Sequence, residues 1–120
     1  MTLLVQAAWA LLALIHLMPA LALFRPALIT QLYGVAPGEA TFLLLHHRAA
    51  LFFAVLVLCV WSVFAAAPRP AAAVATAISM LTFLLLYWQA GSPPALRTIA
   101  VADLIGLPAL ALVIWAALRG

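Results

Sequence analysis

Residues 42–50 read Phe-Leu-Leu-Leu-His-His-Arg-Ala-Ala, and they open an apolar run that continues to Ala67 with Ser62 as its single interruption after Arg48. Three ionisable side chains, those of His46, His47 and Arg48, stand inside this run. A run of this length crosses a bilayer, and ionisable groups are costly within the hydrocarbon core. We therefore interpret residues 41–66 as a membrane span that carries a candidate functional site.

Comparable apolar runs occupy residues 3–24, 71–90 and 95–118. Hydrophobic residues make up 71% of the 120-residue chain and charged residues 6%, with a mean hydropathy of +1.35. A soluble domain of this size cannot cover itself with so little polar surface. The sequence predicts an all-α membrane protein, an up-down bundle of four transmembrane helices that forms one domain over residues 1–120.

The segment between the first two spans has a different pattern. Residues 26–33 place apolar side chains on one helical face and Thr30 and Gln31 on the other, and Gly34 follows as a C-terminal cap. Amphipathic helices of this kind lie flat in the membrane interface. We expect a short interfacial helix here.

Successive spans cross the membrane in opposite directions, and this places all the embedded ionisable residues in the same half of the bundle. We call side A the membrane surface that carries the connections between spans 1 and 2 and between spans 3 and 4. At about 1.5 Å per residue, His16, the triplet 46–48 and Asp103 lie roughly 7–14 Å in from side A. The other half is expected to hold only uncharged polar residues, namely Gln6, Ser62, Thr76 and Ser79.

Successive residues of a helix point about 100° apart, so His46, His47 and Arg48 cannot all face one point. At least one of them is expected to face a helix contact or the surface. Asp103 needs a partner, and Arg48 or a histidine is the natural choice because a paired charge is cheaper to bury.

Three interpretations of this cluster remain open. It can be a structural hydrogen-bonded cluster, a pocket for an amphipathic small molecule, or a haem site built on His16 with His46 or His47. No H-x-x-E or C-x-x-C spacing accompanies the histidines, so apart from the haem alternative we assign no residue as a metal ligand.

If the cluster carries out chemistry, its residues suit proton transfer. A histidine can act as acid or base, Asp103 can orient it or act as base, and Arg48 can stabilise negative charge. Quinone reduction and isoprenoid isomerisation both fit these groups, with quinone as the candidate cofactor. The candidate catalytic residues are His47, Arg48 and Asp103, and the candidate ligand-binding residues are His16, His46, Tyr33, Gln89 and Arg97.

Four short motifs resemble the DoxX-like family of small four-span bacterial membrane proteins: Ile15-His16-Leu17-Met18-Pro19, Leu32-Tyr33-Gly34-Val35, His47-Arg48 and Asp103. Members of that family are associated with quinone-linked or thiol-linked redox systems. The resemblance implies that His16, His47, Arg48 and Asp103 face inward and that His46 is partly peripheral.

The formal net charge of +3 comes from five arginines, without lysine, so it reflects a shortage of acids and does not indicate nucleic-acid binding. The absence of lysine and the alanine-leucine bias suggest a multi-pass protein of the bacterial inner membrane. Expected partners are membrane lipids, a lipophilic small molecule, and a second copy or another membrane subunit. The alternative to ligand binding is an accessory subunit of a larger membrane complex without a catalytic site of its own.

Overall fold

The long apolar runs form helices whose bounds follow the predicted spans closely. The computed structural model describes residues 2–119, and within them four helices are long and apolar enough to cross a membrane. They contain 20 to 25 residues, or about 30–38 Å of helix, which matches the hydrocarbon thickness. The elements are α1 (Thr2–Leu21), α2 (Ala27–Tyr33), α3 (Ala40–Phe64), α4 (Arg69–Gln89), the 3-10 turn η1 (Pro94–Leu96) and α5 (Arg97–Arg119).

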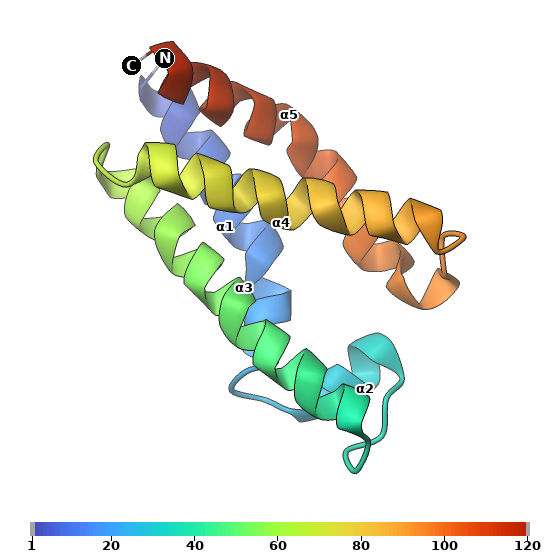
Figure 1. Cartoon of the computed structure of the whole chain (residues 1–120). Helices are drawn as coiled ribbons and strands as arrows, with labels where there is room; N and C mark the ends of the chain where they lie inside the picture. Colours follow the sequence, from blue (N-terminus) through green and yellow to red (C-terminus); the bar gives the residue numbers. More distant parts are fainter. Residues whose placement is uncertain (1, 120) are drawn as a thin grey trace.

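The long helices form an up-down bundle, as predicted (Figure 1). Helix α1 packs against α3 and α5, and α4 packs against the same two helices from the other side. Each long helix therefore has two main neighbours, and the order around the bundle is α1, α3, α4, α5. Side A carries α2 and η1, and the opposite surface, side B, carries the short connection between α3 and α4.

The main core lies between the helices and is built around α1. Trp9 and Leu12 of α1 are fully buried against Met80 of α4 and Val113 of α5. Gly106 allows the closest approach, because a Cβ atom there would lie 2.5 Å from Ile15 Cδ1 and 2.9 Å from Met80 Cε. The absence of a side chain at this position thus lets α5 pack tightly against α1 and α4.

Helices α3 and α4 are close at their side B connection and diverge toward side A (Figure 1). Helix α2 lies at the open end, where it contacts both α3 and η1. The short helix α2 therefore bridges α3 and the η1 turn that follows α4, at the membrane surface where α3 and α4 are farthest apart.

Helix α2 confirms the predicted interfacial helix. Ile29 on its apolar face is fully buried against Ala22 and Ala49, while Thr30 and Gln31 are exposed. Gly34 ends the helix in the left-handed conformation, at φ 70°, and its N–H donates to the carbonyl of Thr30. The chain needs glycine here because other residues adopt this backbone conformation at a cost.

Candidate functional site

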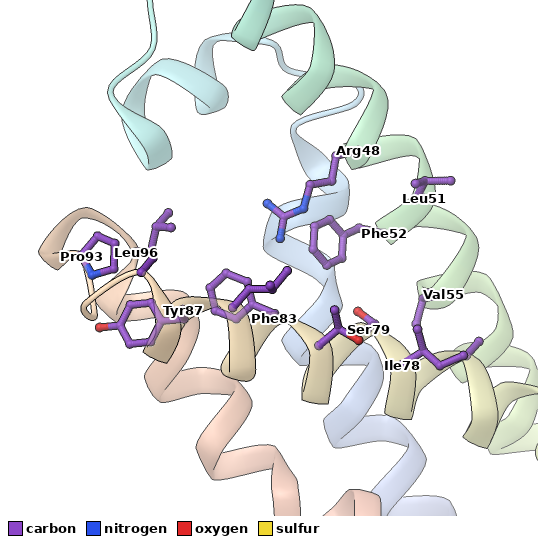
Figure 2. Close-up of a pocket in the computed structure, with 14 residues that line it drawn as sticks. Arg48, Leu51, Phe52, Val55, Ile78, Ser79, Phe83, Tyr87, Pro93 and Leu96 are labelled. Carbon is purple, nitrogen blue, oxygen red and sulfur yellow. The ribbon is translucent and has the colours of Figure 1, made fainter.

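A groove of about 700 Å³ occupies the divergence between α3 and α4 (Figure 2). It follows α4 from Ala75 to Ala90, a length of about 22 Å. Its walls are apolar apart from Arg48, two hydroxyl residues of α4 and Tyr87. The lining residues are Arg48, Leu51, Phe52, Val55, Ala75, Ile78, Ser79, Thr82, Phe83, Leu86, Tyr87, Ala90, Pro93 and Leu96.

The rims of the groove are apolar and exposed. Leu51 of α3 and Ile78 and Leu86 of α4 are 58%, 62% and 56% exposed. Side chains of this kind on the outer surface of membrane-spanning helices face lipid. The groove therefore opens sideways, toward the hydrocarbon of the bilayer.

Arg48 provides the charge of the groove. Its guanidinium carbon lies 4.6 Å from the ring centroid of Phe52, 5.7 Å from that of Phe83 and 6.0 Å from that of Tyr33. These rings come from α3, α4 and α2, and cation–π contacts with them hold the charge in place. Among residues 2–119, no carboxylate lies within ion-pair distance of Arg48.

Tyr33, a predicted ligand-binding residue, lies beside this charge at the end of α2. Burial raises the pKa of its phenol above the ordinary value, and the charge of Arg48 opposes the rise only in part. The phenol is therefore neutral near pH 7, so it can donate a hydrogen bond but does not neutralise Arg48.

His16 is buried where α1 meets α4, next to the groove. Its Nδ1 is 2.9 Å from the Leu12 carbonyl oxygen and its Nε2 is 3.2 Å from Ser79 Oγ. A carbonyl only accepts, so Nδ1 carries the hydrogen, and in the neutral ring Nε2 accepts from the Ser79 hydroxyl. The other side of the ring faces Phe52, with 5.9 Å between ring centroids.

Phe52 thus connects the two polar parts of the site, since its ring contacts both Arg48 and His16. Ser79 lines the groove and hydrogen-bonds to His16 on its inner side. A bound molecule can therefore contact Arg48 near the side A end of the groove and the Ser79 hydroxyl deeper in the bilayer.

The structure places Ser79 differently from the depth prediction. Ser79 was expected in the side B half, away from the ionisable residues, but it is hydrogen-bonded to His16. It is the central residue of the 21-residue helix α4. Ser79 thus lies at the boundary between the two halves of the bundle, where α4 crosses α1 (Figure 1), and a division into two halves did not anticipate contact across that boundary.

Asp103 is buried on α5, one helical turn before Gly106, and therefore faces the same side toward α1 and α4. It does not line the groove, and the charge of Arg48 acts on it only through space. The expected Asp103–Arg48 ion pair is not formed: within residues 2–119, neither that pair nor a hydrogen bond to the Asp103 carboxylate is present.

The structure also reverses the expectation for the two adjacent histidines. His47 is exposed on the outer surface of α3, whereas His46 is half-buried and its Nε2 lies 3.0 Å from the Leu23 carbonyl oxygen. His46 also packs edge-on against Phe42. With Arg48 turned into the groove, the 100° step between residues leaves His47 facing outward.

These positions do not suit the haem alternative. His16 uses both ring nitrogens within the protein, His46 faces a backbone carbonyl, and His47 is exposed. In the described part of the chain, no three side chains of His, Cys, Asp or Glu are grouped so as to hold a metal ion.

Gln89 and Arg97, the remaining predicted ligand-binding residues, are both exposed at side A. Gln89 ends α4 and Arg97 begins α5, and neither lines the groove. Of the eight predicted site residues, the structure places Arg48 in the groove, with Tyr33 and His16 next to it.

Sequence reasoning missed most of the groove lining. The α4 lining residues follow a helical spacing of three or four, and Ser79, Thr82 and Tyr87 on this stripe carry hydroxyl groups. On α3, Arg48, Phe52 and Val55 show the same spacing. Hydroxyl groups aligned on one face of an otherwise apolar span are the signal that identifies this face.

No known protein family, no curated protein and no solved structure matches this chain. Its architecture is that of a small four-span membrane protein.

Proposed function

We propose that this membrane protein binds an amphipathic small molecule in the groove between α3 and α4, with the polar head at Arg48. The observation that carries the proposal is an arginine without a carboxylate partner in residues 2–119, in the wall of a long apolar groove. A volume of about 700 Å³ falls in the range of small-molecule sites.

The chemistry of the groove restricts the class of ligand. Arg48 has only donors, so the head must accept hydrogen bonds or carry negative charge. The apolar length along α4 suits an extended hydrocarbon or isoprenoid tail. A quinone, an isoprenoid phosphate and a phospholipid all combine these two features.

Proton transfer is a further part of the proposal, and it rests on His16 and Ser79. The hydrogen bond from the Ser79 hydroxyl to His16 Nε2 gives a ligand in the groove indirect contact with a buried base. The proposal includes no contact between the ligand and Asp103 or His47. Asp103 faces the contact between α1 and α5, and His47 faces the exterior.

The proposed setting is the bacterial inner membrane, and the proposed relationship is to the DoxX-like family. The motifs around His16, Tyr33 and Arg48 support it, since Arg48 lines the groove and Tyr33 and His16 lie next to it. A second copy or another membrane subunit is proposed as a partner.

Native mass spectrometry of the detergent-purified protein tests the proposal. A long-tailed benzoquinone and farnesyl diphosphate serve as probes, and an ultraviolet oxidised-minus-reduced difference spectrum detects quinone retained from the host membrane. We expect at least one of these molecules to bind the wild type, and Arg48→Gln to weaken its binding about tenfold or more.

Arg97→Gln is the matched control, because it removes an arginine at side A that does not line the groove. Equal losses in R48Q and R97Q contradict the proposal. Ligand-free protein that is stable only with a co-purified membrane subunit favours the accessory-subunit alternative.

A further inference from the structure

A second hollow, of about 500 Å³, lies at side B, the opposite membrane surface from α2. Its walls come from the first half of α1, the start of α4 and the end of α5, which lie at one end of the bundle (Figure 1). We name it the side B pocket. It is lined by Val5, Trp9, Ala66, Arg69, Pro70, Val113, Trp115, Ala116, Ala117 and Arg119.

Two arginines give the side B pocket its charge. Arg69 begins α4 and Arg119 ends α5, so both lie at the level of lipid headgroups. The two acids of the chain, Glu39 and Asp103, lie at the start of α3 and in the side A half of α5. Within residues 2–119, neither arginine of the pocket therefore has a carboxylate partner.

Both arginines are anchored. Arg69 Nε donates to the Ser62 carbonyl oxygen at 2.8 Å, which leaves its terminal nitrogens unused by that bond. The guanidinium carbon of Arg119 lies 4.8 Å from the ring centroid of Trp115, a lining residue. A charge held by a hydrogen bond or by an aromatic ring loses less freedom when it binds an anion.

Trp9 packs in the wall of the pocket. Trp9 is fully buried, and its indole Nε1 has no hydrogen-bond acceptor among the described residues. This N–H is enclosed by protein atoms, so it is not among the donors that a ligand in the pocket would reach. The adjoining walls are apolar, which suits the glycerol and acyl region of a lipid below a charged head.

We propose that the side B pocket binds a phosphate-class anion, with Arg69 and Arg119 as the charged ligands. Two guanidinium groups match the oxygens of a phosphate, which they can bind in a bidentate manner. The position at the membrane surface points to the phosphate of an anionic lipid. This site lies at the other end of the bundle from the α3–α4 groove and does not depend on the function proposed for that groove.

Native mass spectrometry with defined lipids provides the test. Wild-type protein is exchanged into detergent containing either phosphatidylglycerol or phosphatidylcholine, and the retained lipid is counted per protein. We expect phosphatidylglycerol to be retained preferentially, and Arg119→Gln to reduce that retention about tenfold. Arg119 is the first choice because its recorded contact is with the Trp115 ring, so R119Q breaks no hydrogen bond of the fold.

Arg69→Gln is the second variant, and Arg25→Gln, an exposed arginine at side A, is the control. A parallel titration with inorganic phosphate distinguishes the sources: stabilisation of the wild type but not of R119Q, without a lipid preference, assigns the site to a free anion. Equal retention of the two lipids without phosphate stabilisation overturns the proposal, and so does an equal effect of R25Q and R119Q.

Discussion

At the scale of single residues, the hydrogen bond between Ser79 and His16 joins α1 to α4. We predict that Ser79→Ala destabilises the protein by about 0.5–1.5 kcal/mol, because it leaves Nε2 of a buried histidine unpaired. Thermal unfolding in detergent measures the loss. Thr82→Ala, at an exposed position of the same groove, is the control and should change stability by less than about 0.5 kcal/mol.

A second prediction concerns Asp103. In residues 2–119 its buried carboxylate has no ion pair or hydrogen bond, so an amide of the same shape removes a desolvated acid without breaking a contact. Asp103→Asn should therefore leave the melting temperature unchanged or raise it. If the free energy of unfolding falls by more than about 1 kcal/mol, the carboxylate accepts a hydrogen bond from a donor outside the isolated chain, such as a bound ligand or subunit.

The sequence located the important residues better than it oriented them. Arg48 and His16 were identified from the cost of ionisable groups in a membrane, which needs no knowledge of rotation about the helix axis. The choice between His46 and His47 does need that knowledge. It was wrong because the orientation of α3 is set by Arg48, which packs among rings of three elements.

At the scale of helices, Gly106 controls the packing of α5. An alanine there displaces only the ends of two flexible side chains, those of Ile15 and Met80, and gains about 1 kcal/mol of helix propensity over glycine. We predict that Gly106→Ala is nearly neutral, whereas Gly106→Leu costs about 1–3 kcal/mol by overpacking.

Unfolding in detergent distinguishes these outcomes. Ala111→Leu is the matched control, because this exposed residue of α5 faces outward and has room for the larger side chain. If G106L is as stable as A111L, α5 does not pack as closely on α1 and α4 as the structure indicates.

The helices themselves were predictable within a few residues, since length and hydropathy determine a membrane span. The face that each helix turns inward was harder to predict. In apolar spans both the lipid side and the protein side are hydrophobic, so the usual contrast between core and surface is weak. On α4, the hydroxyl residues Ser79, Thr82 and Tyr87 mark the groove face, but Thr76, a fourth hydroxyl residue, is buried against Cys59 away from the groove.

At the scale of the whole molecule, the divergence of α3 and α4 creates the groove, and Ala75 lies at the end nearer side B. We predict that Ala75→Phe shortens the groove, so that binding of a long-tailed benzoquinone falls while that of a short-tailed one persists. Native mass spectrometry with both probes measures the difference. Val74→Phe places the same ring on the exposed face and should bind both molecules as the wild type does.

This divergence could not be predicted from the sequence. Short connections predict that neighbouring helices are antiparallel, but they do not determine the angle between them. Here the close contact at Gly106 brings α5 against α1 and α4, while α2 and η1 occupy the side A end that the divergence opens. The angle thus results from contacts among segments far apart in the chain.

The lipid-facing rims of the α3–α4 groove, at Leu51, Ile78 and Leu86, have a consequence for how occupancy is measured. A hydrophobic molecule arriving through these rims diffuses in two dimensions and never dissolves in water. Its occupancy is then governed by its mole fraction among the lipids, and diluting the sample with buffer leaves that fraction unchanged. Titrations in nanodiscs should therefore superimpose when plotted against ligand per lipid and separate when plotted against total concentration.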